Sequence, residues 1–157
     1  MSIHAWRIVR ATQAARAFAG DGSKKYGGRW NSAALAVVYT AGSVSLAILE
    51  MLVHLRSEEL LSRYVLFEAT FDETLVVPVD PNMLPRTWQC TPRPLVVRRV
   101  GNDWLAKGRS AVLRVPSAIV PTEWNYLLNP AHPDFGKIAI GPKTPIQFDP
   151  RLIKTST

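Results

Sequence analysis

The chain has 157 residues, of which 47% are hydrophobic and 20% charged, and this balance excludes a disordered protein. A single cysteine excludes an intrachain disulfide, and together with three histidines it leaves too few ligands for a structural zinc site. The net charge of +7 favours an anionic partner. We therefore expect one globular domain over residues 1–157, in a reducing cytoplasm, without a bound metal ion.

The positive charge is concentrated in two segments of the chain. Residues 1–50 contain six basic and two acidic residues, and residues 86–114 contain seven basic residues and one acidic residue. Fields of this kind attract the phosphates of RNA, DNA or a dinucleotide, or an acidic protein surface. Charge alone does not choose among these partners.

The N-terminus lacks the long apolar segment of a secretory signal. Residues 33–55 are apolar enough to imitate a membrane span, but Gly42, Glu50 and His54 interrupt them. A strand, a turn and a helix explain this segment better, so we expect no membrane association.

The first half of the chain predicts short elements in irregular alternation. We expect a strand at 4–9, one or two helical turns at 12–18 capped by Thr12, a loop at 20–23, a glycine turn at 27–28, and strands at 37–40, 64–71 and 75–79. Between these strands a helix follows from Leu46, with Ser43 or Ser45 as its cap. Ser57 recaps this helix, which continues to about Arg63.

The second half begins with five prolines between Pro78 and Pro94, which exclude regular structure through most of that segment. We expect a surface loop there whose Leu84 and Trp88 pack inward. The remaining expected elements are a helix at 95–107 interrupted near Gly101, a strand at 111–115 extended by Ile119 and Val120, a turn-rich stretch at 125–134, and strands at 137–140 and 146–148. Short strands with few helices favour the α+β class.

Glu50 is the only charged residue in the apolar helical segment 46–53. Burying an unpaired carboxylate costs several kcal/mol, so Glu50 needs a partner or a task. Structural interpretations are an ion pair with Arg29 or Arg7, or a pair with His54 one helical turn later. A metal site shared with His54 lacks the second histidine of HExxH-type sites. The functional interpretation is a carboxylate beside a developing positive charge, as in glycosidic-bond cleavage.

Arg29 and Tyr39 are two further candidates for ligand binding. Arg29 follows two glycines whose backbone lets a ligand approach closely, and its guanidinium suits bidentate phosphate or carboxylate binding. Alternatively it stacks on Trp30 or pairs with an acid. The ring of Tyr39 can stack on a flat ligand, although an ordinary buried strand tyrosine is the common alternative.

Ser117 follows Pro116 at the end of a predicted strand, and Asn125 and Asn129 come a few residues later. They are either polar ligand contacts or turn residues that bond their own backbone. The chain has no G-x-S-x-G elbow, so a serine hydrolase is poorly supported. It also has no GxGxxG or Walker A loop, which excludes an ordinary Rossmann or P-loop nucleotide site.

Six segments in this order resemble the RES-domain family, the toxin halves of bacterial toxin–antitoxin pairs. They are Trp6-Arg7, Gly27 to Asn31, Val38 to Ala41, Leu46 to Glu50, Val115 to Ile119 and Asn125 to Pro130. The family is named after an arginine, a glutamate and a serine, which correspond here to Arg29, Glu50 and Ser117. The chain departs from the family at Ala34, where a glycine is usual.

The resemblance implies an α+β fold similar to the diphtheria-toxin-like ADP-ribosyltransferases, with split antiparallel sheets around an NAD-binding cleft. It also implies an enzyme that cleaves the nicotinamide–ribose bond of NAD. ADP-ribose would pass to phosphate, water or a protein, and cellular NAD would be depleted. NAD is then a substrate, and no cofactor is expected.

The residue roles implied by the resemblance agree with the chemistry of the side chains. Arg29, assisted by Arg7, would bind the pyrophosphate or the neighbouring ribose, and Tyr39 would stack on the nicotinamide. Glu50 would hydrogen-bond a ribose hydroxyl and stabilise an oxocarbenium-like transition state. Ser117 would position the nicotinamide ribose. Asn125 is a further expected substrate-binding residue.

The expected partners are an Xre-type helix-turn-helix antitoxin and a second copy of the toxin, both implied by the resemblance. One alternative is a basic nucleic-acid-binding or RNA-cleaving toxin that uses residues 86–114 with Trp88 and Trp104. Another is that Glu50 and Arg29 form a structural pair and the protein merely binds a partner.

Overall fold

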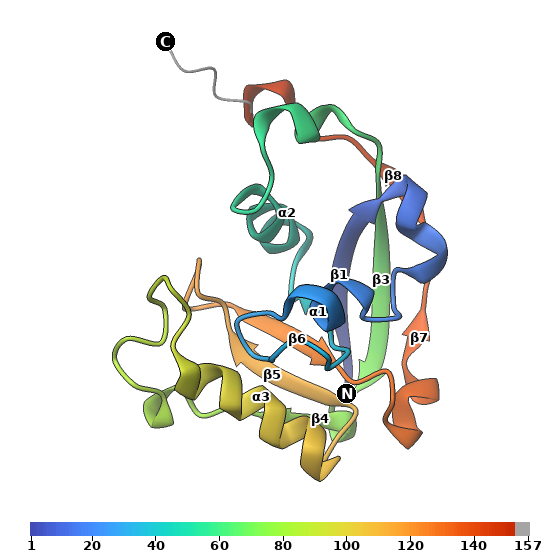
Figure 1. Cartoon of the computed structure of the whole chain (residues 1–157). Helices are drawn as coiled ribbons and strands as arrows, with labels where there is room; N and C mark the ends of the chain where they lie inside the picture. Colours follow the sequence, from blue (N-terminus) through green and yellow to red (C-terminus); the bar gives the residue numbers. More distant parts are fainter. Residues whose placement is uncertain (153–157) are drawn as a thin grey trace.

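The computed structural model describes residues 1–152, which form one sheet with helices against it (Figure 1). Its strands are β1 (Ser2–Arg10), β2 (Val38–Ala41), β3 (Tyr64–Asp72), β4 (Val76–Pro78), β5 (Val112–Pro116), β6 (Trp124–Leu128), β7 (Ala139–Ile140) and β8 (Thr144–Ile146). Their order in the sheet is β4-β5-β6-β2-β1-β3-β7, and β8 also pairs with β3. The α-helices are α1 (Asp21–Tyr26), α2 (Val44–Leu52) and α3 (Leu95–Lys107).

The sheet is nearly divided between β1 and β2. These strands are joined by a single register pair, Trp6 opposite Ala41, whereas β1 pairs with β3 along its whole length. In Figure 1, β1 and β3 stand upright while β5 and β6 cross the lower part of the view. The α+β class and the split sheet are therefore confirmed. One pair departs from the antiparallel pattern, because β4 runs parallel to β5.

The predicted strand, turn and helix over residues 33–55 are confirmed as β2 and α2. Ser43 is the cap of α2, since its Oγ accepts a hydrogen bond from the N–H of Leu46 at 3.0 Å. The helix ends at Leu52 and does not reach Arg63. A separate 3₁₀ turn, Ser57–Leu61, precedes β3. Within residues 1–152, no helix is both long and apolar enough to cross a membrane.

Two expectations about the first thirty residues were wrong. The segment 20–23 is mostly helical, because α1 begins at Asp21 directly after a left-handed Gly20. The expected helical turns near Thr12 are present as a 3₁₀ helix, Ala11–Arg16, but this helix begins after Arg10 without a side-chain cap, so Thr12 is not its cap.

The expectations for residues 119–128 were also wrong. β5 stops at Pro116 because Ser117 Oγ accepts hydrogen bonds from the N–H groups of Ile119 and Val120, which turns the chain. The expected turn at 125–128 is the central strand β6, paired with β2 on one side and β5 on the other. Its Leu127 and Leu128 are completely buried, so burial decided the conformation of this segment.

Helix α3 is continuous through Gly101, contrary to the expected interruption. Gly101 is buried, and a Cβ atom there would overlap the carbonyl group of Trp30. The glycine therefore allows α3 to approach the turn that carries Trp30. Trp30 and α3 share a core with Trp88 and Trp104, which confirms that the proline-rich loop packs its tryptophan inward.

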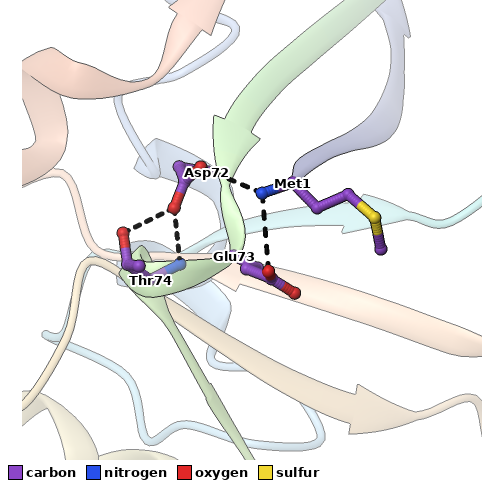
Figure 2. Close-up of polar contacts among 4 residues, drawn as sticks. All are labelled: Met1, Asp72, Glu73 and Thr74. Atoms are coloured by element: carbon purple, nitrogen blue, oxygen red, sulfur yellow. Dashed lines mark hydrogen bonds and ion pairs between the residues drawn. The ribbon is translucent and has the colours of Figure 1, made fainter.

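The two long strands are also joined at their ends, where the amino group of Met1 lies 3.3 Å from Asp72 and 3.4 Å from Glu73 (Figure 2). Asp72 accepts further hydrogen bonds from the N–H and hydroxyl of Thr74. These contacts, above all the bond from the Thr74 hydroxyl, lower the pKa of Asp72 to about 2.

Candidate active site

The turn from Gly27 to Asn31 lies directly against Tyr39. The N–H of Gly28 donates to the carbonyl of Asn31 at 2.9 Å, and Gly27 has a φ of +73°, which favours glycine. A Cβ atom on Gly28 would overlap the Tyr39 hydroxyl and the Asn31 amide oxygen. The two glycines therefore fix the position of Arg29 relative to β2.

The hydroxyl of Tyr39 is held within the protein. It donates to Asn31 Oδ1 at 2.5 Å and accepts a hydrogen bond from the N–H of Trp30 at 3.2 Å. Burial raises the pKa of Tyr39 well above its usual range, so the phenol is protonated at neutral pH. The half-buried ring, and not the hydroxyl, is the part of Tyr39 left for a ligand.

Arg29 is half-buried and is positioned by the proline-rich loop. Its Nη1 donates to the carbonyls of Trp88 at 2.9 Å and Cys90 at 3.2 Å. Burial and the neighbouring Arg93 lower the pKa of Arg29, whereas the charge of Glu50 acts in the opposite direction. Glu50 is thus close enough to act electrostatically on Arg29, but the two form no ion pair among residues 1–152.

Glu50 projects from the second turn of α2 and is held by two neutral donors. Its Oε1 accepts hydrogen bonds from Ser117 Oγ at 2.8 Å and Asn125 Nδ2 at 2.6 Å. Three elements, α2, the end of β5 and β6, therefore converge on one carboxylate oxygen. No donor among residues 1–152 is bonded to Oε2 of this half-buried side chain, which leaves that oxygen for a ligand hydroxyl.

Ser117 is completely buried, and its hydrogen-bonding capacity is fully used. The hydroxyl donates to Glu50 and accepts from the N–H groups of Ile119 and Val120, each at 3.1 Å. A hydroxyl has one hydrogen and two lone pairs, so this arrangement is complete. In the structure Ser117 holds Glu50, and its predicted contact with the substrate ribose stays a prediction.

Asn125 also has an unsatisfied atom beside Glu50. Its Nδ2 donates to the carboxylate, while its buried Oδ1 has no hydrogen-bond donor among residues 1–152. Buried amide oxygens are normally paired. Its contact with a substrate remains a prediction.

Arg7 lies on β1, the strand that pairs with β2, which carries Tyr39. Its Nε donates to the carbonyl of Ala17 at 2.5 Å and its Nη1 to the carbonyl of Tyr39 at 2.9 Å. Burial lowers the pKa of Arg7 to about 10, so it remains cationic at neutral pH. Its observed partners are carbonyls, and the ion pair considered between Arg7 and Glu50 is absent from the described residues.

A cavity of about 310 Å³ adjoins the glycine turn. It is lined by Tyr26, Gly27, Gly28, Asn31, Ala33, Pro92, Arg93 and Arg98. A second hollow of about 360 Å³ lies against residues 14–19, Phe67 and Ile140, and none of the candidate residues lines it. None of the six predicted site residues lines the first cavity either, but Gly28 and Asn31, which contact Tyr39, do line it. The first cavity therefore adjoins the candidate site.

Sequence reasoning missed Asn31, Arg93 and Arg98 at this site. Asn31 is completely buried and connects the turn to Tyr39. In the sequence, Arg93 and Arg98 are distinguished only as members of the basic segment 86–114. Their density was visible in the sequence, but the folding of the proline-rich loop over the glycine turn was not.

No group of three His, Cys, Asp or Glu side chains within residues 1–152 is arranged to hold a metal ion. The site instead combines the Glu50 carboxylate, whose Oε2 accepts no hydrogen bond among residues 1–152, with the half-buried guanidinium of Arg29 and the ring of Tyr39. This combination suits a cationic group beside Glu50 and an anionic group beside Arg29.

Comparisons with known proteins identify the family of this chain. The RES domain family profile matches residues 4–149. A protein named "Toxin Res" from Yersinia enterocolitica is 40% identical over 149 residues, covering 94% of this chain and 97% of that protein. A "Prs ADP-ribosylating toxin" from a Sphingobium species is 41% identical over 159 residues, covering 98% and 99% of the two chains.

A solved structure shows the same fold. The crystal structure of the M. tuberculosis MbcT–MbcA toxin–antitoxin complex contains a chain that superposes with a TM-score of 0.79 at 18% identity, covering 98% of this chain and 87% of that one. Because the family profile spans nearly the whole sequence and the relatives are matched over 97% and 99% of their length, this chain belongs to the RES domain family.

Proposed function

We propose that this protein is the toxin of a toxin–antitoxin system and that it cleaves the nicotinamide–ribose bond of NAD. The observation that carries the proposal is the Glu50 carboxylate, which Ser117 and Asn125 fix through Oε1 while no donor among residues 1–152 bonds to Oε2. The names of the relatives support the toxin assignment, and the Sphingobium name supports transfer of ADP-ribose.

In the proposed reaction the bond between ribose C1′ and the nicotinamide nitrogen breaks, and its electron pair neutralises the pyridinium ring. Positive charge develops on C1′ and the ring oxygen. Glu50 stabilises this charge and hydrogen-bonds a ribose hydroxyl through Oε2. Arg29 holds the pyrophosphate, and the Tyr39 ring packs on the nicotinamide. An oxygen of phosphate, water or a protein then bonds to C1′, any proton on that oxygen is released to solvent, and the transfer is complete.

Nicotinamide leaves as a neutral molecule, so no general acid is required. The protonated, internally bonded Tyr39 hydroxyl is compatible with this scheme, because the scheme uses only the ring. The Arg7 guanidinium donates a hydrogen bond to the backbone carbonyl of Tyr39 and so holds this residue in place. We propose that Arg7 positions β2 and that its positive charge attracts the pyrophosphate.

The proposed partner follows from the harm that NAD cleavage would do to the cell that makes this protein. An enzyme that drains NAD in the cytoplasm must be held inactive, and the structural neighbour was solved as a toxin–antitoxin complex. We propose an Xre-type antitoxin whose acidic segment covers the site, since the chain carries a charge of +7, and a homodimeric toxin core. Expression of the chain alone should stop growth while NAD falls, and co-expression with the neighbouring upstream gene should restore both.

The nucleic-acid alternative is weakened by the packing of the tryptophans. Trp88 is 9% exposed and Trp104 is 4% exposed, so neither ring is available to stack on a base. The test is to incubate purified protein with NAD, without RNA, and measure free nicotinamide. Release by the wild type and none by Glu50→Gln supports the proposal, and no release by folded wild-type protein contradicts it.

A further inference from the structure

The cavity beside the glycine turn carries two arginines that the proposed mechanism does not use. Arg93 comes from the proline-rich loop and Arg98 from the first turns of α3, and both line the cavity opposite Gly27 and Gly28. Its volume of about 310 Å³ lies at the lower end of the range for small-molecule sites, about 300–1,000 Å³.

The charges around this cavity are of one sign. None of the ion pairs formed among residues 1–152 includes Arg29, Arg93 or Arg98. Burial has the largest effect on the pKa of Arg29 and of Tyr39, lowering the first and raising the second, and the charge of Arg93 acts to lower both. The Arg93 guanidinium therefore acts on the same space as the candidate site. Arginines that gather without an ion-pair partner repel one another, and a bound anion would relieve this repulsion.

The cavity also offers an aromatic surface. Tyr26, an exposed residue, lines it, and the Lys25 ammonium lies 5.1 Å from the centre of the Tyr26 ring. Apart from the two arginines, the remaining lining is glycine, alanine, proline and Asn31. Guanidinium groups recognise phosphate in a planar geometry, and an exposed ring can stack on a base. The lining therefore fits a nucleoside phosphate better than an isolated inorganic anion.

We propose that this cavity binds the adenosine 5′-phosphate half of NAD, with Arg93 and Arg98 on its phosphate and Tyr26 against the adenine. The proposal rests on the proposed function and deepens it. Arg29 then serves the phosphate nearer the nicotinamide. Arg98 and its neighbour Arg99 have different roles, because Arg99 is exposed and does not line the cavity.

The experiment compares the double variant Arg93→Gln, Arg98→Gln with a control pair, Arg86→Gln and Arg99→Gln, which removes the same charge from exposed positions outside the cavity. Binding of AMP to the full chain is measured by calorimetry. We expect the cavity variant to lose at least about tenfold in affinity, the loss typical of removed charge-assisted contacts, and the control pair to stay within about twofold. Arg93→Lys with Arg98→Lys should be intermediate.

Kinetics with two substrates then separate the halves of the dinucleotide. For the cavity variant, kcat/KM should fall about tenfold or more with NAD and stay unchanged with nicotinamide mononucleotide, which lacks the adenosine phosphate. Equal losses with both substrates, or equal AMP affinity in all variants, would overturn the proposal. AMP binding that depends on Arg93 and Arg98 in a protein that releases no nicotinamide would uphold the nucleotide site and reject the proposed reaction instead.

Discussion

Ser117 donates its hydroxyl hydrogen to the Glu50 carboxylate at 2.8 Å, across 67 residues of sequence. This bond joins the end of β5 to the second turn of α2. It involves Oε1 alone, as does the bond from Asn125, so the carboxylate is oriented without being blocked. A fixed, half-buried carboxylate requires no reorganisation when positive charge develops beside it, which is the condition for strong electrostatic stabilisation.

Glu50→Gln should abolish most activity while the fold is retained. The amide oxygen can still accept from Ser117 and Asn125, but the negative charge is lost. Loss of one preorganised electrostatic group typically costs about 10²–10³ in kcat. Nicotinamide release and the thermal midpoint would be measured together. An active Glu50→Gln enzyme would remove Glu50 from the proposed mechanism.

Ser117→Ala tests whether Ser117 acts through Glu50. The change removes the donor to Glu50 and leaves two backbone N–H groups unpaired, so we expect a loss of about 1–3 kcal/mol in the free energy of unfolding. If Ser117 only positions Glu50, kcat should fall about tenfold while KM for NAD changes little. A large rise in KM with kcat preserved would instead indicate direct contact with the substrate.

Arg29→Lys should raise KM for NAD strongly. A lysine retains the charge but not the planar fork that binds phosphate oxygens in pairs, and the expected loss in kcat/KM is about tenfold or more. Arg99→Lys, on an exposed part of α3, is the matched control and should leave KM unchanged. Initial rates of nicotinamide release over a range of NAD concentrations would distinguish the two.

Ala34→Gly should stabilise the protein. Ala34 has a φ of +76°, a left-handed conformation that costs an L-residue about 1–2 kcal/mol, part of which is offset by the greater flexibility of glycine in the unfolded chain. We expect a net gain of about 0.5–1 kcal/mol in urea unfolding. The neighbouring Ala33 does not have a positive φ, so Ala33→Gly should only increase the flexibility of the unfolded chain and lower stability. A gain in both variants would contradict the explanation.

Asp72 should make stability depend on pH in the acid range. Its pKa is about 2 in the folded protein and 3.8 without its partners, so its contribution is present above about pH 4 and is lost as the pH falls towards 2. Asp72→Asn should show a shallower decline of the thermal midpoint between pH 4 and pH 2 than the wild type. Parallel declines would show that the contacts in Figure 2 contribute nothing in solution.

Features that depend only on neighbouring residues were predictable from the sequence. The alternation of β3, the glycine turn before Arg29 and the Ser43 cap of α2 follow from local conformational preference. The isolation of Glu50 in an apolar helix was likewise visible from residues within one turn. These signals were sufficient to identify the candidate carboxylate and guanidinium.

Tertiary structure decided how these residues are connected. The local sequence predicts a turn at Asn125, but β6 is a strand because it is paired on both sides and buried, and burial outweighs local propensity. Gly101 reads as a helix interruption until the carbonyl of Trp30 occupies the space of its missing Cβ. Arg93 reaches the glycine turn only when the proline-rich loop folds over it. Hydrogen bonds and charge contacts between segments depend on positions in space, and local periodicity carries no information about those positions.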